Sequence, residues 1–206
     1  MKNYEGNIGV VGLSGSGKSL LGQTLREELG WKAPVIDAGQ FFRDALDKMG
    51  RQVQEGAKIP LRIDREVDSQ TLDVLRGESQ RIIVGRTVSH LAVVEGLGIE
   101  RYVGIGVKCD GREIAGRAQK VWNRKKKLPE DTPLPSLRHI LSVTKIRNFN
   151  DLGRYAKLYG IKSARDLYGK PPNIMIVHSD RMSLHEEVEA IMSQLRALNL
   201  LGNINK

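Results

Sequence analysis

The stretch from Gly12 to Ser19 constrains this chain more than any other. It fits the pattern G-x-x-x-x-G-K-[ST], whose glycines let the backbone turn tightly and aim its N–H groups at a phosphate. An apolar run over residues 8–13 precedes the loop, and a run with leucines on one helical face follows it over residues 20–29. Strand, glycine loop and helix are the context that makes this pattern credible. The stretch predicts nucleoside triphosphate binding and says little about what becomes of the phosphate.

Within this loop, Lys18 can reach the outer phosphates and the Ser19 hydroxyl can ligate Mg²⁺. The start of the following helix adds its positive dipole end. The alternative, a glycine-rich turn before an ordinary helix, does not explain why all four fixed positions are filled. We therefore expect triphosphate contacts from Gly12, Leu13, Ser14, Gly15, Ser16, Gly17, Lys18, Ser19 and Leu20.

The chain length and the cysteine count bound the class of protein. The 206 residues suffice for a single domain, 1–206, with a full core. The one cysteine, Cys109, excludes an internal disulfide and favours a reducing compartment. No signal sequence is visible at the N-terminus, and no apolar run approaches membrane-spanning length. We expect a cytoplasmic monomer without a membrane partner.

The net charge of +9, from 33 basic and 24 acidic side chains, favours polyanionic partners. These are either small phosphorylated molecules or nucleic acid. Aromatic residues make up only 5% of the chain and show no pattern for stacking bases, so RNA binding stays possible but is not favoured.

Strand-like and helical patterns alternate along the chain. After the first strand, apolar segments at 34–37, 80–84, 102–107 and 173–177 are separated by amphipathic stretches. This alternation predicts an α/β fold with a five-stranded parallel sheet and helices on both faces.

Two candidate site residues follow strands at their carboxyl ends, where ligands bind in such sheets. Asp37 ends the second segment, and Arg86 follows the third; Arg43 lies on the helix after Asp37. Taken alone, Asp37 is equally well explained as a helix N-cap, and Arg43 as a solvated helix charge.

Residues 136–159 predict a long helix on which Arg147, Asp151 and Arg154 share a face about 60° wide. On spacing alone, a surface ion-pair ladder is the preferred interpretation. We expect the broadly opposite, apolar face to pack inward; its residues are Leu141, Phe149, Leu152, Tyr155, Ala156 and Tyr159.

Residues 117–127 contain six basic side chains and no acid, and a connector with three prolines follows to residue 135. Beside a phosphate-binding loop, this segment predicts a small basic lid over about 117–135. A solvated basic surface or a nucleic-acid contact is the alternative.

Several of these pieces together resemble the cytidylate kinases, a branch of the P-loop nucleoside monophosphate kinases, in their compact archaeal-type form. The resemblance rests on the loop from Gly12 and on Val35–Arg43, Ile63–Asp68, Ile82–Arg86 and Arg147-x-x-x-Asp151-x-x-Arg154. It implies a P-loop NTPase fold, an acceptor-binding segment over about 39–77, and transfer of the ATP γ-phosphoryl group to CMP or dCMP. ATP and Mg²⁺ are the cofactors that it implies.

The resemblance also implies residue roles. Phosphoryl transfer would depend on Lys18, Arg117, Arg124, Arg147 and Arg154. The acceptor would be held by Asp37, Gly39, Arg43, Arg86, Arg147, Asp151 and Arg154. Mg²⁺ would be held by Ser19 of the loop and by Asp37, the best substitute for an acid that the family often has at the end of the third strand and that is missing here.

The sequence departs from the family at several positions. Thr87 stands where some members have an acid that reads the cytosine amino group, Lys162 replaces an acid, and Ile114 replaces one arginine of a pair. The base is therefore left open. Two alternatives remain: a P-loop kinase for another nucleotide or a metabolite, and an NTP-dependent RNA-binding protein.

Overall fold

Five parallel strands form one sheet in the described part of the chain. This computed structural model describes residues 4–48, 59–77, 79–123, 128–161, 163–168 and 174–201, with only the backbone at 164 and 165. The strands are β1 (Asn7–Gly12), β2 (Ile36–Asp37), β3 (Ile82–Gly85), β4 (Tyr102–Lys108) and β5 (Ile174–His178). Their order is β2-β3-β1-β4-β5, and every neighbouring pair is parallel. The predicted α/β fold is confirmed.

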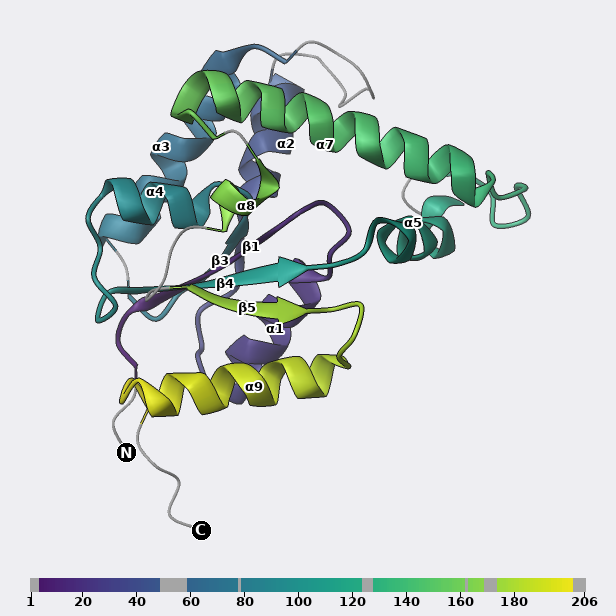
Figure 1. The fold of residues 1–206 in the computed structure, drawn as a ribbon. Helices are drawn as coiled ribbons and strands as arrows, with labels where there is room; N and C mark the ends of the chain where they lie inside the picture. The colour runs from purple at the N-terminus through teal and green to yellow at the C-terminus, as the bar shows by residue number, and fades with distance from the viewer. Residues whose placement is uncertain are drawn as a thin grey trace.

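Helices cover both faces of this sheet (Figure 1). On one face lie α1 (Lys18–Glu28) and α9 (Leu184–Ala197). On the other lie α2 (Ala38–Lys48), α3 (Leu61–Gly77), α4 (Val88–Val94), α7 (Leu137–Tyr159) and the short α8 (Ala164–Leu167). Helix α5 (Gly111–Lys120) continues beyond the end of β4, beside the beginning of α7. The carboxyl ends of the strands therefore face the region between α1, α5 and α7.

The core has one part on each face of the sheet, and all six residues of β1 are buried between them. On the first face, Leu21 and Leu25 of α1 pack with Ile191 and Leu195 of α9. On the second face, a separate cluster is built from α3, α4, β4 and α8, with Leu75, Leu91, Tyr102 and Tyr168 among its members. The central strand thus holds the phosphate-binding loop at a rigid point of the molecule.

Local signals set both ends of α7 and the start of α9. Ser136 caps α7 by accepting a hydrogen bond from the His139 N–H, and Gly160 ends it in the left-handed conformation. A capping box of Ser183 and Glu186 is present at the start of α9. The second strand is shorter than expected: only Ile36 and Asp37 pair with β3. Pro34, which has no N–H to donate, lies outside the ladder.

Two residues named in the sequence analysis, Arg124 and Lys162, fall outside the described residues. Within the described ranges, none of the helices combines the length and the apolar character that a membrane crossing needs.

Candidate active site

The loop between β1 and α1 is shaped by its glycines. Gly15 and Gly17 have φ values of 83° and 97°, in the left-handed region that glycine adopts without strain. A Cβ atom on Gly12 would stand 2.6 Å from the carbonyl oxygen of Val107 at the end of β4. A side chain at any of these positions would move the loop, so the backbone conformation predicted for phosphate binding depends on them.

Lys18, the first residue of α1, folds back over this loop. Its Nζ donates a hydrogen bond to the carbonyl oxygen of Leu13 at 2.6 Å. The pKa of the Lys18 ammonium is lowered to about 7, chiefly by burial and also by Arg86 and Arg147, while Asp37 opposes the shift. Burial and the neighbouring arginines therefore destabilise the charged form of Lys18, and a bound anion would reduce the repulsion between these cations.

The loop has the donor groups that a triphosphate needs. Ser16 is buried, and its Oγ has no hydrogen-bond partner among the described residues. Ser19 is exposed at the start of α1, as an Mg²⁺ ligand beside bound phosphates would be. The described ranges show no group of three His, Cys, Asp or Glu side chains that could hold a metal ion. Mg²⁺ typically takes one or two protein ligands together with waters and phosphate oxygens, which suits Ser19 and Asp37.

Across from the loop, four buried side chains form a continuous series of ion pairs, called here the ionic chain. Asp64 of α3 pairs with Arg154 of α7 at 2.9 Å, and Arg154 pairs with Asp151 at 2.9 Å. Asp151 then pairs with Arg86, which directly follows β3. Exposure of these side chains is 13% or less. The ionic chain joins α3, α7 and the end of β3, so a surface ladder on α7 is the wrong interpretation.

The guanidinium of Arg154 is fixed by rings as well as by carboxylates. It lies 5.6 Å from the ring centroid of Phe42 and 5.7 Å from that of Tyr155. Phe149, expected to pack inward, is 76% exposed, whereas Asp151 is buried. The expected packing face of α7 is therefore partly wrong, because this helix turns its charged residues toward partners on α3 and β3.

Asp37 makes the contact of a helix cap, and its role in ligand binding stays a prediction. Its Oδ1 accepts a hydrogen bond from the Gly39 N–H at 2.9 Å, as a cap does, and its Oδ2 pairs with Arg43 at 3.0 Å. It also stands at the carboxyl end of β2, close enough to raise the pKa of Lys18. Arg147 acts on the same lysine and on Arg86. The structure therefore brings Lys18, Asp37, Arg86 and Arg147 into one electrostatic neighbourhood.

Arg117 has partners other than those a lid arginine would have. Its Nε pairs with Glu113 at 2.9 Å, and its Nη2 donates to the Ser179 carbonyl oxygen at 2.5 Å. Its Nη1 reaches the Ser16 carbonyl oxygen at 3.4 Å. Arg117 thus ties the phosphate-binding loop to the connection between β5 and α9. The lid over 117–135 stays a prediction.

Sequence reasoning missed Asp64 and Asp68. The two acids lie one turn apart on the buried stripe of α3, between Ile63 and Thr71. Asp68 Oδ1 accepts a hydrogen bond from the Thr87 hydroxyl at 3.1 Å. A usable signal was present, since two acids within an apolar helical stripe require buried partners.

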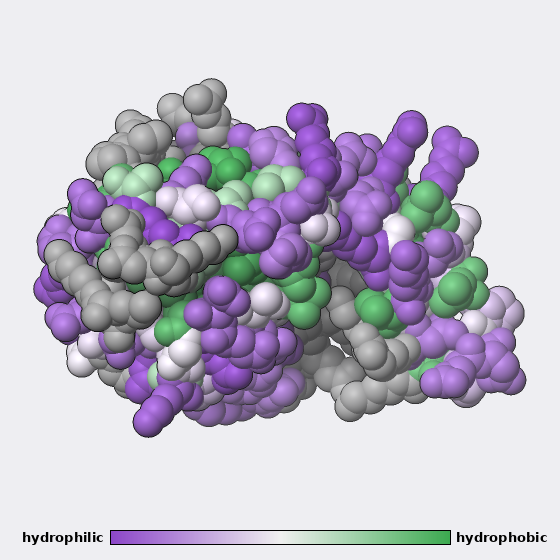
Figure 2. Space-filling view, turned by 90° about the horizontal axis from the view of Figure 1, so that it is seen from below, coloured by the Kyte–Doolittle hydropathy of each residue, from purple (hydrophilic) through white to green (hydrophobic). Residues whose placement is uncertain are grey.

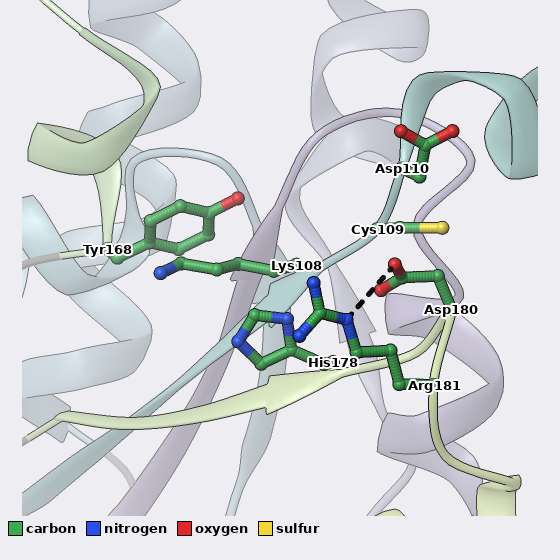
Figure 3. Close-up of a pocket in the computed structure, with 7 residues that line it drawn as sticks. All are labelled: Lys108, Cys109, Asp110, Tyr168, His178, Asp180 and Arg181. Carbon is green, nitrogen blue, oxygen red and sulfur yellow. Dashed lines mark ion pairs between the residues drawn. The ribbon is translucent and has the colours of Figure 1, made fainter.

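A separate cavity of about 410 Å³ opens at the carboxyl ends of β4 and β5 (Figure 3). In it, the Lys108 ammonium lies 6.0 Å from the ring centroid of Tyr168, and Arg181 pairs with Asp180 at 3.8 Å. Ser179, between two lining residues, donates its hydroxyl hydrogen to the Ser16 carbonyl oxygen at 2.8 Å. The wall of the cavity is therefore linked to the phosphate-binding loop. The lining residues are Lys108, Cys109, Asp110, Tyr168, His178, Asp180 and Arg181.

Comparison with known proteins supports the fold. A family model described as "AAA domain" matches residues 11–102. A gluconokinase from Sinorhizobium meliloti superposes with a TM-score of 0.58 at 16% identity, covering 95% of this chain and 94% of its own. A shikimate kinase from Acinetobacter baumannii, solved with shikimate, has a TM-score of 0.55 at 16% identity, covering 97% of each chain. An uncharacterized protein from Eubacterium ventriosum has a TM-score of 0.61 at 14% identity, covering 94% of this chain and 99% of its own. The search of curated proteins finds no match.

The chain therefore has a P-loop kinase fold. The resemblance to cytidylate kinases is confirmed only at this coarser level, because the kinases named are of other kinds. At identities this low, the likeness fixes the fold and leaves the acceptor open.

Proposed function

We propose that this protein is an ATP-dependent kinase whose small acceptor binds between the loop at Gly12 and the ionic chain. The observation that carries the proposal is the electrostatic neighbourhood of Lys18. A lysine on a phosphate-binding loop is coupled there to Arg86 and Arg147, which belong to the other side of the site. Phosphoryl transfer requires that the donor phosphates and the attacking acceptor atom are held in line, with cations that stabilise the charge of the transferring group.

In this proposal the protein acts by positioning and by neutralising charge. The loop N–H groups and Lys18 hold the donor phosphates, and Ser19 and Asp37 hold Mg²⁺, which neutralises charge on the phosphates. Arg43, Arg86, Arg147 and Arg154 hold the acceptor side. Closure of the segment 117–135, with Arg117 and Arg124, would keep water from taking the phosphoryl group.

The acceptor that we propose first is a nucleoside monophosphate, CMP or dCMP. Four arginines on the acceptor side suit an acceptor that carries its own phosphate. Arg86 and Arg154 share Asp151, so each can turn part of its guanidinium to a ligand and keep a carboxylate partner. The attacking phosphate oxygen of such an acceptor also needs no general base, because it has no proton to lose.

A hydroxyl-bearing metabolite is the second candidate, and one observation favours it. Asp37 places a carboxylate near Lys18, where it could take the proton from an attacking hydroxyl. In addition, Asp64 and Asp151 already neutralise Arg86 and Arg154, which leaves less positive charge for a phosphate on the acceptor. Shikimate kinase and gluconokinase, which share the fold, are named for acceptors of this kind.

The two candidates give chemically different products, so ³¹P NMR of the reaction mixture separates them. The protein is incubated with ATP, Mg²⁺ and a panel of nucleoside monophosphates and hydroxylated metabolites. A nucleoside monophosphate acceptor gives a phosphoanhydride, so two nucleoside diphosphates form for each ATP consumed, both of them ADP when the acceptor is AMP. A hydroxyl acceptor gives a phosphate monoester. Consumption of ATP without either product would contradict the proposal.

A further inference from the structure

Asp68 is a buried acid without a cationic partner among the described residues. It is 7% exposed, and its Oδ1 accepts the hydroxyl hydrogen of Thr87 at 3.1 Å. Its Oδ2 has no hydrogen-bond partner in the described part of the chain. One turn earlier on the same helix, Asp64 is neutralised by Arg154. The two acids thus share a helix face, but Asp64 has a cationic partner whereas Asp68 has only a hydroxyl partner among the described residues.

Leaving a buried carboxylate oxygen unsatisfied costs free energy, and among the described residues only the Thr87 hydroxyl is seen to stabilise the charge of Asp68. The pKa of Asp68 is raised to about 7, chiefly by burial, with Thr87 opposing the shift and Asp64 contributing to it. An unsatisfied buried acid beside a ligand site is a strong candidate for a group that binds ligand.

The position of Asp68 and Thr87 indicates that they belong to the acceptor side of the site. Thr87 directly follows Arg86 at the carboxyl end of β3, next to the ionic chain. The hydroxyl hydrogen of Thr87 is committed to Asp68, so the Thr87 oxygen is left as an acceptor. The ionised oxygen of Asp68 is an acceptor as well. Asp68 and Thr87 together therefore suit a ligand group that donates hydrogen bonds. The same two acceptors would repel a carboxylate on the ligand.

We propose that Asp68 and Thr87 determine acceptor specificity by accepting hydrogen bonds from an exocyclic amino group on the acceptor's base. This inference rests on the proposed function and refines its acceptor site. It predicts that amino-bearing bases, cytosine and adenine, are preferred to their oxo counterparts, uracil and hypoxanthine.

The test compares kcat/KM for CMP against UMP, and for AMP against IMP. We expect the wild-type protein to prefer the amino base, and Asp68→Asn to reduce that preference by about tenfold or more. The KM for ATP should stay unchanged. Thr87→Val should act in the same direction, and Thr87→Ser, which keeps the hydroxyl, should retain the preference. Asp73→Asn, an exposed acid on the same helix, is the matched control.

Equal loss of CMP and UMP turnover in Asp68→Asn would overturn the inference, because a purely structural role moves both together. Equal wild-type use of amino and oxo bases would overturn it as well. Calorimetric binding of CMP and UMP separates this inference from the proposed function. An Asp68-dependent preference in binding without any phosphoryl transfer would support the inference and contradict the kinase proposal. Equal binding of the two nucleotides, or binding of neither, would contradict the inference even in an active kinase.

Discussion

At the scale of single residues, Lys18 is the group on which phosphate binding depends most. It contacts the Leu13 carbonyl oxygen within its own loop and makes no contribution to the apolar core. We predict that Lys18→Met lowers phosphoryl transfer by about 10²–10³-fold or more, because a charge that stabilises the transferring group is lost. The melting temperature should stay level or rise, since a buried cation is removed. Initial rates and thermal melts measure both effects, and a variant with wild-type turnover would contradict the role of the loop.

The low pKa of Lys18 also predicts proton uptake on nucleotide binding. With a pKa of about 7, the lysine is mostly neutral at pH 8 in the free protein, and bound phosphates should restore its charge. Calorimetry at pH 8 in two buffers of different ionisation enthalpy should show uptake of close to one proton. Lys18→Met is the control and should show less. Equal binding enthalpies in the two buffers would contradict the prediction.

The same shift has a consequence for the stability of the free protein. The folded-state pKa of Lys18 lies below its unfolded value, so the unfolded chain binds more protons between about pH 7 and pH 10. The contribution of this group is therefore most favourable above that window and is lost as the pH falls through it.

At the scale of helices and strands, the ionic chain is what holds α3, α7 and the end of β3 together around the site. Its members are far apart along the chain: Arg154 and Asp64 are separated by 90 residues. It therefore combines a structural and a functional role, and a single substitution should affect both.

Arg154→Ala tests this double role. The change leaves Asp64 and Asp151 with one cation fewer, and breaking such a buried pair costs about 3–5 kcal/mol. For a chain of this size that lowers the melting temperature by roughly 6–20 °C. We also expect kcat/KM to fall about 10²–10³-fold at temperatures where the variant is folded.

Arg138→Ala, an exposed arginine near the start of the same helix, is the control and should change neither quantity. If Arg154→Ala melts early but keeps its rate when folded, the ionic chain is structural only. If it loses rate without a change in melting, the pairs seen in the structure contribute little to stability.

Sequence predicts a structural feature well when the residues that determine it are close together along the chain. The caps at Ser136, Gly160 and Ser183 and the strand–loop–helix at Gly12 are encoded within a few residues, and all of them are present. The partners of Asp64, Asp68 and Arg117 lie on distant segments, so nothing in their neighbourhood along the chain identifies them. The exposure of Phe149 has the same cause, because ion pairs between α7 and distant segments set the orientation of this helix.

At the scale of the whole molecule, the chain carries a net charge of +9. Figure 2 shows the face that bears α1 and α9, where apolar side chains are scattered among polar ones. The part formed by α5 and the beginning of α7 projects to one side in this view and in Figure 1. Long-range attraction of phosphorylated ligands needs no more than such a net charge.

That charge also predicts some binding to RNA, of a non-specific kind. Affinity should fall steeply as salt rises, with the slope that counterion release gives. RNA should leave the rate of ADP release unchanged, because the proposed acceptor is a small molecule. A salt titration of RNA binding, paired with ADP-release rates with and without RNA, measures both. Stimulation of ADP release by RNA alone at physiological salt would favour the RNA-binding alternative instead.

The most direct test of the central claim is the initial rate of ADP release from ATP and Mg²⁺ in the presence of single small acceptors. The panel holds nucleoside monophosphates and hydroxylated metabolites, and each rate is compared with that of Lys18→Met. We predict at least one acceptor that raises ADP release well above the acceptor-free rate, with CMP or dCMP the strongest and with no such rise in the variant. ADP release that no acceptor raises, or that Lys18→Met retains in full, would contradict the claim that this is a small-molecule kinase built on the loop at Gly12.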